Sequence, residues 1–327
     1  MAVALSAGCS DEASSAATAG ASAPGAFPVT VEHAFGSTVV PADPQRVVTV
    51  GLTEHDTVLA LGIVPVGVTE WYGDRPSATW PWAHEALGGA EPTVLSATDG
   101  FEFEKIASLR PDLIVGTNAG MTRADYDTLS VIAPTIAHAD GYESAYFQPW
   151  DVQALAVGRA LGREAEITRI VGDVKARFRE AADDHPEFAG TSIAFLQNAF
   201  YDGNAIAYQE GLSTAFLTDL GFTIPSALAA FSKDGGQAYI PVERLPVLDA
   251  ADVLLWATES PADRTKLEEN ALYRRLDAVK EGRLVFTDAT TAGAIYFTSV
   301  LSLPYVLDRL VPALASTMAG EGPATTW

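Results

Sequence analysis

The pattern of apolar and polar residues divides the chain into two β/α regions separated by a long helical stretch. Short apolar runs predict buried strands in the first region, at Arg46–Gly51, Ile63–Thr69, Asp112–Gly116 and Thr135–Ala139. Helical periodicity falls between them, at Phe103–Leu109 and Thr122–Ile132. Strands that alternate with helices are typical of parallel β-α units. The sequence therefore predicts an N-terminal α/β lobe over residues 29–150.

The stretch from Asp151 to Asp184 has a different pattern. Its apolar residues recur every three or four positions, which is typical of an amphipathic helix, and Gly162 marks a predicted break. The part from Arg163 to Asp184 would be about 33 Å long at about 1.5 Å per residue. A helix of this length between two lobes acts as a stiff spacer rather than as a soft linker.

A second set of strand patterns follows, at Ser192–Leu196, Ala205–Tyr208, Asp252–Trp256 and Arg283–Thr287. Trp256 lies inside an apolar strand and is expected in the core. Helices are predicted at Leu212–Leu220, Lys266–Lys280 and Thr298–Leu314, with a kink or break at Pro304. The predicted fold class is α/β, with two α/β lobes joined by a single long rigid helix. The remaining boundaries are 151–189 for the inter-lobe helical region, 190–315 for the C-terminal lobe and 316–327 for a tail.

Composition narrows the class of protein. The 327 residues suit one large domain or two of ordinary size, and 48% of them are hydrophobic, which excludes disorder throughout. Forty-two Asp and Glu residues against 20 Lys and Arg give a net charge of -22, which has the wrong sign for a nucleic-acid binder. The apolar runs are strand-sized and do not predict a membrane-spanning helix. The single cysteine excludes an internal disulfide and clusters that need several Cys ligands.

That cysteine lies in a short motif at the amino terminus. Leu5-Ser-Ala-Gly-Cys9 resembles a bacterial lipobox, in which the cysteine receives a lipid anchor. No basic residue and only eight residues precede Cys9, so residues 1–9 are expected to be a truncated lipoprotein signal. The alternative is a chance cysteine in a tail. Residues 10–28 are rich in small residues and are expected to form a flexible tether. These features predict a protein anchored by lipid to the extracytoplasmic face of the cell membrane.

Two passages of the chain resemble each other. Glu104 is followed by Leu109, a turn at Asp112 and an apolar strand, and Glu243 is followed in the same way by Asp252 and a strand. Each Glu opens a short helix, where a carboxylate also interacts favourably with the helix dipole. The repetition predicts equivalent Glu residues at equivalent corners of the two lobes.

Together these features resemble the class III substrate-binding proteins of ABC importers, the ferric-siderophore and cobalamin-binding family, over about residues 29–315. The resemblance rests on Leu109-Arg-Pro-Asp-Leu-Ile-Val-Gly116, the long helix, the repeated passage and the lipobox. Passages such as Gly67–Gly73, Gly116–Gly120 and Gln197–Asp202 resemble the actinobacterial siderophore branch. The resemblance implies a monomer that holds its ligand between two lobes and closes by a small rotation. It also implies that Glu104 and Glu243 dock arginines of the ABC permease subunits.

A cleft for a large chelate needs aromatic walls and a few polar anchors. Loop residues of these types are the candidate ligand-binding residues, although each aromatic residue alone is more often core or interface packing. They are Trp71, Tyr72, Arg75, Trp80, Tyr146, Tyr201, Tyr208, Tyr239 and Tyr296.

The number of cations available to the cleft narrows the class of ligand. Ferric tris-catecholates and ferric citrate are anions, and a cleft for them would need several cations. Six of the 20 Lys and Arg residues lie in the stretch 151–189, which leaves 14 for the two lobes. Among these, the candidate cleft cations are Arg75, Arg123, Lys233 and Arg46. We therefore expect a ferric hydroxamate or a mixed-ligand ferric siderophore. Ferric iron would be carried only as the chelate, with no other cofactor. Haem or cobalamin is the alternative ligand.

Direct metal binding and catalysis are not expected. The five histidines do not share close metal-ligand spacing, and His55 is expected to cap a helix or to be solvated. The sequence has no G-x-S-x-G nucleophile motif and no phosphate-binding glycine loop. A carboxylate-dependent hydrolase is a second alternative that no spacing supports. The sequence predicts a binding protein for iron uptake rather than an enzyme.

Overall fold

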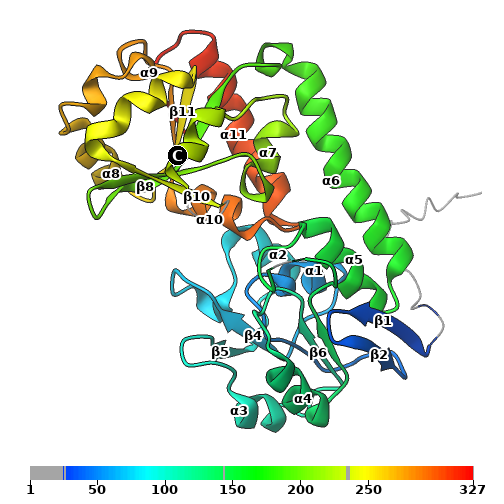
Figure 1. The fold of residues 1–327 in the computed structure, drawn as a ribbon. Coiled ribbons are helices and arrows are strands. Elements are labelled where there is room, and N and C mark those ends of the chain that lie inside the picture. The colour runs from blue at the N-terminus through cyan, green and yellow to red at the C-terminus, as the bar shows by residue number, and fades with distance from the viewer. Residues whose placement is uncertain (1–24, 26, 143, 233–235, 327) are drawn as a thin grey trace, which may run out of the picture.

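The structure of this chain is a computed structural model that describes residues 25, 27–142, 144–232 and 236–326. Cys9 and the lipobox lie outside the described residues. The chain forms two α/β lobes with a long helix alongside both (Figure 1). The predicted fold class is therefore confirmed. None of the described helices combines the length and the apolar character that crossing a membrane requires.

Lobe one is built on a five-stranded parallel sheet in the order β5-β4-β3-β6-β7. Its strands are β3 (Val47–Thr49), β4 (Gly67–Glu70), β5 (Thr93–Ser96), β6 (Leu113–Gly116) and β7 (Thr135–Ala137). An antiparallel hairpin of β1 (Val29–His33) and β2 (Gly36–Val40) precedes the sheet. The helices are α1 (Glu54–Ala60), α2 (His84–Leu87), α3 (Phe103–Ser108) and α4 (Arg123–Ile132), with 3-10 segments at Pro76–Ala78 and Pro81–Ala83.

The strands predicted from apolar runs in lobe one correspond to β3, β4, β6 and β7. The sequence did not predict β1, β2 or β5. Only alternate residues, or a single residue, of those three strands are buried, so they lack a continuous apolar run.

Lobe two contains a mixed six-stranded sheet in the order β10-β9-β8-β11-β12-β13. Its strands are β8 (Ile193–Tyr201), β9 (Asn204–Tyr208), β10 (Gln237–Pro241), β11 (Val253–Ala257), β12 (Leu284–Phe286) and β13 (Ala324–Thr325). The helices are α7 (Ala215–Thr218), α8 (Pro261–Glu268), α9 (Asp277–Lys280), α10 (Ala289–Phe297) and α11 (Ser302–Met318). The 3-10 segments are Pro186–Phe188, Leu212–Thr214, Ser226–Phe231, η6 (Val242–Ala250) and Tyr273–Arg275. Trp256 is fully buried in β11, as predicted.

Two helix predictions in lobe two were wrong. The single helix predicted at Lys266–Lys280 is interrupted after α8, because the Asn270 side-chain oxygen accepts the backbone N–H groups of Leu272 and Tyr273 and turns the chain. The last predicted helix begins at Ser302 instead of Thr298. Thr298 has φ +47° and separates α10 from α11, and Pro304 lies in the first turn of α11, where its missing N–H costs little. β13, in the range expected as a tail, pairs with β12.

The helical stretch forms α5 (Trp150–Ala160) and α6 (Glu164–Asp184), with the predicted break at Gly162, which has φ +63°. The apolar stripe of α6 is divided between the two cores. Ile167 and Val171 belong to a hydrophobic cluster of lobe one, whereas Val174 and Phe178 belong to the core of lobe two. One straight helix therefore completes both cores, and Figure 1 shows α6 running along both lobes.

A second connection between the lobes lies at residues 297–301. Phe297, at the end of α10, contacts the rings of Trp71 and Trp82 in lobe one, each with centroids 5.1 Å apart. Val300 is buried in the lobe-one cluster. The fully buried Asp56 carboxylate of α1 accepts hydrogen bonds from the Ser299 hydroxyl and, at 2.8 Å, from the Trp82 indole N–H. These contacts form a direct connection between the two lobes, in addition to α6.

Candidate binding cleft between the lobes

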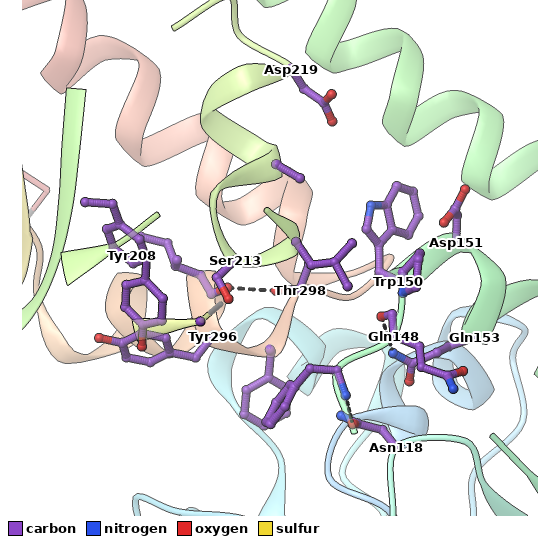
Figure 2. A pocket seen from close by; sticks show the side chains of 18 of the residues that line it. Asn118, Gln148, Trp150, Asp151, Gln153, Tyr208, Ser213, Asp219, Tyr296 and Thr298 are labelled. Atoms are coloured by element: carbon purple, nitrogen blue, oxygen red, sulfur yellow. Dashed lines mark hydrogen bonds between the residues drawn. The ribbon is translucent and has the colours of Figure 1, made fainter. Parts of the chain in front are cut away.

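A cavity of about 950 Å³ opens between the lobes, and residues from both lobes and from α5 and α6 line it. Parallel strands of an α/β sheet place the loops that follow them at one edge, which is where ligands of such folds bind. Figure 2 shows Tyr208 and Tyr296 of lobe two on one side of this cavity and Asn118 and Gln148 of lobe one on the other. Trp150 and Asp151 lie at the start of α5.

The lobe-one wall is aromatic. Trp71 and Tyr72 follow β4, and their rings meet edge to face with centroids 4.9 Å apart; Phe147 lies 5.6 Å from Trp71. Behind Tyr72 is Trp80, which is only 2% exposed and stacks on Trp82. Trp71 and Tyr72 are therefore each supported by a buried ring, Phe297 behind Trp71 and Trp80 behind Tyr72.

The lobe-two wall is polar and hydrogen-bonded. The Gln237 side-chain amide donates to the Gln197 carbonyl oxygen at 2.8 Å and to the Tyr208 hydroxyl at 3.1 Å. The Tyr208 hydroxyl donates to the same Gln197 oxygen at 3.1 Å. These three side chains come from adjacent strands β8, β9 and β10 and form one network facing the cavity.

Two phenol groups of the cleft lack hydrogen-bond partners within the described part of the chain. The hydroxyls of Tyr72 and Tyr296 are buried and have no partner among the described residues. Burial raises the pKa of both groups above that of a free phenol, so both stay protonated and can donate. A buried polar group without a partner is costly unless something satisfies it, and here a ligand atom in the cavity can do so.

Among the described residues that line the cavity, acidic side chains outnumber basic ones. The carboxylates are Asp151, Asp219 and Glu259, and the cations are Lys175 and Arg179 of α6. Asp151 is already paired with Lys175 at 2.6 Å. Burial raises the pKa of Asp219, and this outweighs the opposing effect of Lys175. Burial and the Asp263 carboxylate raise the pKa of Glu259. The cleft thus has little net charge, with a slight acidic excess.

Comparison with known proteins places this arrangement in a family. The model of the periplasmic binding protein family matches residues 47–291, which is most of the chain. This chain is a periplasmic binding protein. The predicted class III type of fold is confirmed by solved structures of the same architecture.

Three relatives of this periplasmic binding protein illustrate the likeness. The probable siderophore-binding lipoprotein YfiY of Bacillus subtilis is 32% identical over 289 residues, covering 81% of this chain and 83% of that protein. A periplasmic solute binding protein of Mycobacterium smegmatis has a TM-score of 0.82 and 44% identity, covering 89% of this chain and 98% of that one. PiaA of Streptococcus pneumoniae, solved in complex with ferrichrome, has a TM-score of 0.73 and 28% identity, covering 89% and 99%.

The structure brings four of the nine candidate ligand-binding residues together in the cleft. These are Trp71, Tyr72, Tyr208 and Tyr296. The other five lie outside the set that lines it. Trp80 and Arg75 lie behind the lobe-one wall, with the Arg75 guanidinium 4.2 Å above the Trp80 ring. Tyr146 lies half-exposed on the loop before α5. Tyr201 and Tyr239 border a separate cavity of lobe two.

The cations of the cleft are different from those expected. The residues of α6 were expected to form a spacer, yet Lys175 and Arg179 lie on the cavity wall. Arg46 instead donates to the carbonyl oxygen of Leu109, and Arg123 pairs with Asp127 at 2.9 Å, so neither reaches the cleft. Lys233 lies outside the described residues. No sequence signal shows which face of a spacer helix borders a cavity.

His55 was expected to be solvated or to cap a helix, and that expectation was wrong. It lies fully buried within α1, and burial lowers the pKa of its ring. Its edge packs against Phe297 with ring centroids 5.8 Å apart. Among the described residues, no group of three or more His, Cys, Asp or Glu side chains could hold a metal ion.

The repeated passage makes similar contacts in the two lobes. Asp112, before β6, accepts the backbone N–H groups of Gln45 and Arg46 at 2.8 Å. Asp252, before β11, accepts the backbone N–H of Ser192 at 3.0 Å. In each lobe the preceding short helix carries an exposed Glu in its first turn, Glu104 in α3 and Glu243 in η6. Neither carboxylate has a hydrogen bond or an ion pair with the described residues.

Proposed function

We propose that this protein is the extracytoplasmic substrate-binding component of an ABC importer and that it captures a ferric siderophore between its lobes. The observation that carries the proposal is the cleft itself. It has room for a large chelate, an aromatic wall on one side and a hydrogen-bonded polar wall on the other. The ligands named for YfiY and for PiaA support the same assignment. The family consists of binding proteins, which supports a role without catalysis.

The unpaired hydroxyls of Tyr72 and Tyr296 fit the surface of such a chelate. A ferric siderophore presents carbonyl and metal-bound oxygens to its surroundings and carries hydrocarbon links between them. Phenol donors satisfy the oxygens, and the rings of Trp71 and Phe147 cover the links. Because the two hydroxyls come from opposite lobes, a bound chelate bridges the cleft.

The charge of the cleft favours a neutral or cationic chelate. Lys175 is paired with Asp151, which leaves Arg179 against the carboxylates of Asp219 and Glu259. Ferric tris-hydroxamates are neutral or cationic, whereas ferric citrate and ferric tris-catecholates are anions. We therefore assign the ligand to the hydroxamate or mixed-ligand class, even though α6 supplies two cations to the cleft.

Fluorescence titration tests the assignment, because Trp71 and Trp150 line the cleft and bound ferric chelates quench indole emission. Ferrioxamine E and ferrichrome are expected to bind at least about tenfold more tightly than ferric citrate or a ferric tris-catecholate. The Trp71→Phe variant identifies the quenched residue. Binding of haem or cobalamin with no response to any ferric siderophore would overturn the proposal.

The exposed carboxylates of Glu104 and Glu243 are proposed to dock the permease through its arginines. Rim charges set orientation and encounter rate more than ligand affinity. The double variant Glu104→Ala with Glu243→Ala should lower siderophore uptake by cells at least about tenfold while the chelate affinity stays unchanged. Glu91→Ala with Glu180→Ala, at two other exposed carboxylates, is the matched control. A large loss of chelate affinity in the first variant would place these residues in ligand binding instead.

Cys9 is proposed to carry a lipid anchor that holds the protein at the outer face of the cell membrane. The lipobox motif supports this, and two acyl chains on one cysteine suffice for stable anchoring. Replacing Cys9 by Ala should move the protein from the membrane fraction to the medium. Unchanged membrane retention of that variant would contradict the anchor.

A further inference from the structure

Lobe two contains a second cavity of about 350 Å³ beside the cleft. It lies between strands β8, β9 and β10 and helix α8, and its lining includes Tyr201 and Tyr239. Gln197 and Gln237 line both this side cavity and the cleft. The two cavities therefore share a boundary made in part by two glutamine side chains.

The side cavity coincides with an irregularity in the β8–β9 hairpin. The pairing register shifts between Gln197 and Tyr201, and Asn198 has φ +49°, a left-handed conformation uncommon for residues other than glycine. Such bulges re-aim side chains and are frequent beside binding sites. The Asn198 side-chain carbonyl oxygen is buried and has no hydrogen-bond partner among the described residues. The hairpin therefore keeps a distorted backbone and an unsatisfied polar atom at the wall of a hollow.

The boundary between the cavities is itself a hydrogen-bonded relay. The Tyr239 hydroxyl, which faces the side cavity, donates to the Gln237 carbonyl oxygen at 2.9 Å. The amide of Gln237 continues to Gln197 and to Tyr208 in the cleft. Glutamine side chains rotate at little cost and can exchange these partners for the amide group of a ligand. A ligand arm that crosses the boundary thus finds replacement donors and acceptors along its path.

The wall of the side cavity is polar but nearly uncharged. Amides and phenols dominate it, with Ile206 and Phe200 as apolar patches. Its two charged side chains have opposite signs, and the Asp263 carboxylate is already occupied by the backbone N–H and the hydroxyl of Ser260. These groups match a neutral segment with amide groups and short methylene runs, and they do not match a second iron centre.

We propose that the side cavity binds a neutral, amide-bearing pendant arm of the ferric siderophore whose iron centre occupies the cleft. This assignment rests on the proposed function, because the arm belongs to a chelate whose iron centre is held between the lobes. It also gives Tyr201 and Tyr239 a place in ligand recognition, although both lie outside the cleft.

The contribution of the arm can be measured by comparing two chelates that have the same type of iron centre, of which only one carries an arm. Ferrioxamine E is a closed ring without a pendant arm, and ferric N-acetyldesferrioxamine B carries a neutral arm that ends in an amide. Both are uncharged tris-hydroxamates. The protein is expected to bind the armed chelate at least about fivefold more tightly than the ring, measured by titration calorimetry or Trp quenching.

The Ile206→Trp variant fills the side cavity, because Ile206 lines it and does not line the cleft. The preference for the armed chelate over the ring should fall about tenfold. Tyr239→Ala removes a half-exposed wall residue without overpacking the interior, and it should lower the same preference if Ile206→Trp proves unstable. Val39→Trp, at an exposed position of β2 in lobe one, is the control for a surface tryptophan.

An unchanged preference in folded Ile206→Trp and Tyr239→Ala would overturn the side-cavity assignment while leaving ligand capture in the cleft intact. A wild-type protein that binds the two chelates equally would do the same. A wild-type protein that binds neither would contradict the proposed function and this inference together. Melting temperatures of all variants establish that each comparison is made on folded protein.

Discussion

The two walls of the cleft differ in how they are held. On the lobe-one side, Tyr72 rests on Trp80, which stacks on Trp82, and Phe297 closes the group from lobe two. Gly293 lets α10 approach this group, since a Cβ there would lie 2.6 Å from the Trp80 ring. On the lobe-two side, Gln197, Gln237 and Tyr208 are held by hydrogen bonds to one another. The first wall offers rigid apolar area, whereas the second offers polar groups that can change partners.

This difference separates two contributions to binding. Rigid aromatic surfaces supply most of the binding free energy because they lose little conformational freedom on contact. Exchangeable amides set orientation and selectivity, because each bond to the ligand replaces a bond that already existed. Variants on the two walls should therefore differ in the size and in the kind of their effects.

The largest effect is expected from the aromatic wall. Trp71→Ala with Tyr72→Ala removes both rings and one unpaired donor, and ferric hydroxamate affinity should fall about 100-fold in a fluorescence or calorimetric titration. Tyr72→Phe keeps the ring and isolates the hydroxyl, with a loss of about fivefold. A change of less than about threefold in the double variant would show that this wall does not carry the binding free energy.

A smaller effect is expected from the polar wall. Gln197→Leu keeps the approximate volume and removes the acceptor shared by Tyr208 and Gln237, so affinity should fall about fivefold to tenfold. The ranking of different hydroxamates should change as well, which is the mark of an orienting role. Gln45→Leu, at an exposed glutamine on the far edge of lobe one, is the control. Equal losses for every chelate would show that this wall contributes affinity alone.

The smallest effect is expected from pH. Because burial raises the pKa of Asp219 and Glu259, these carboxylates gain protons at a higher pH than exposed ones and lose negative charge as the solution is acidified. Between pH 7 and about pH 5, the cationic ferrioxamine B should lose about threefold in affinity relative to the neutral ferrioxamine E. Asp219→Asn should weaken this dependence. If the affinity for ferrioxamine B rises relative to that for ferrioxamine E on acidification, the predicted direction of the pH effect is wrong.

The sequence was sufficient where the information is local. The spacing of apolar residues in α6 and the break at Gly162 follow directly from helical periodicity. The repeated Glu-to-Asp passage predicted two corners whose turn carboxylates make matching backbone contacts. Such features depend on neighbours within a few positions, so they are visible before the chain is folded.

The cleft itself was harder to predict because it depends on which surfaces meet. Lys175 and Arg179 belong to a helix whose pattern shows a buried stripe but not which exposed face borders a cavity. In the sequence, Phe297 has the pattern of an apolar helical residue. It contacts Trp71 and Trp82 only because the two lobes pack together. Tyr208 and Tyr239 lie on the adjacent strands β9 and β10 of one sheet, yet they border different cavities.

The return of the chain to lobe one at residues 297–301 has a consequence for the order of folding. Asp56 and the Ser299 hydroxyl it binds are 243 positions apart, and Val300 fills a place in the core of the lobe that is synthesised first. Without Ser299 and Val300, this part of the core of lobe one is unfilled and the Asp56 carboxylate lacks one of its two hydrogen-bond donors. Lobe one is therefore finished only after most of lobe two has been synthesised.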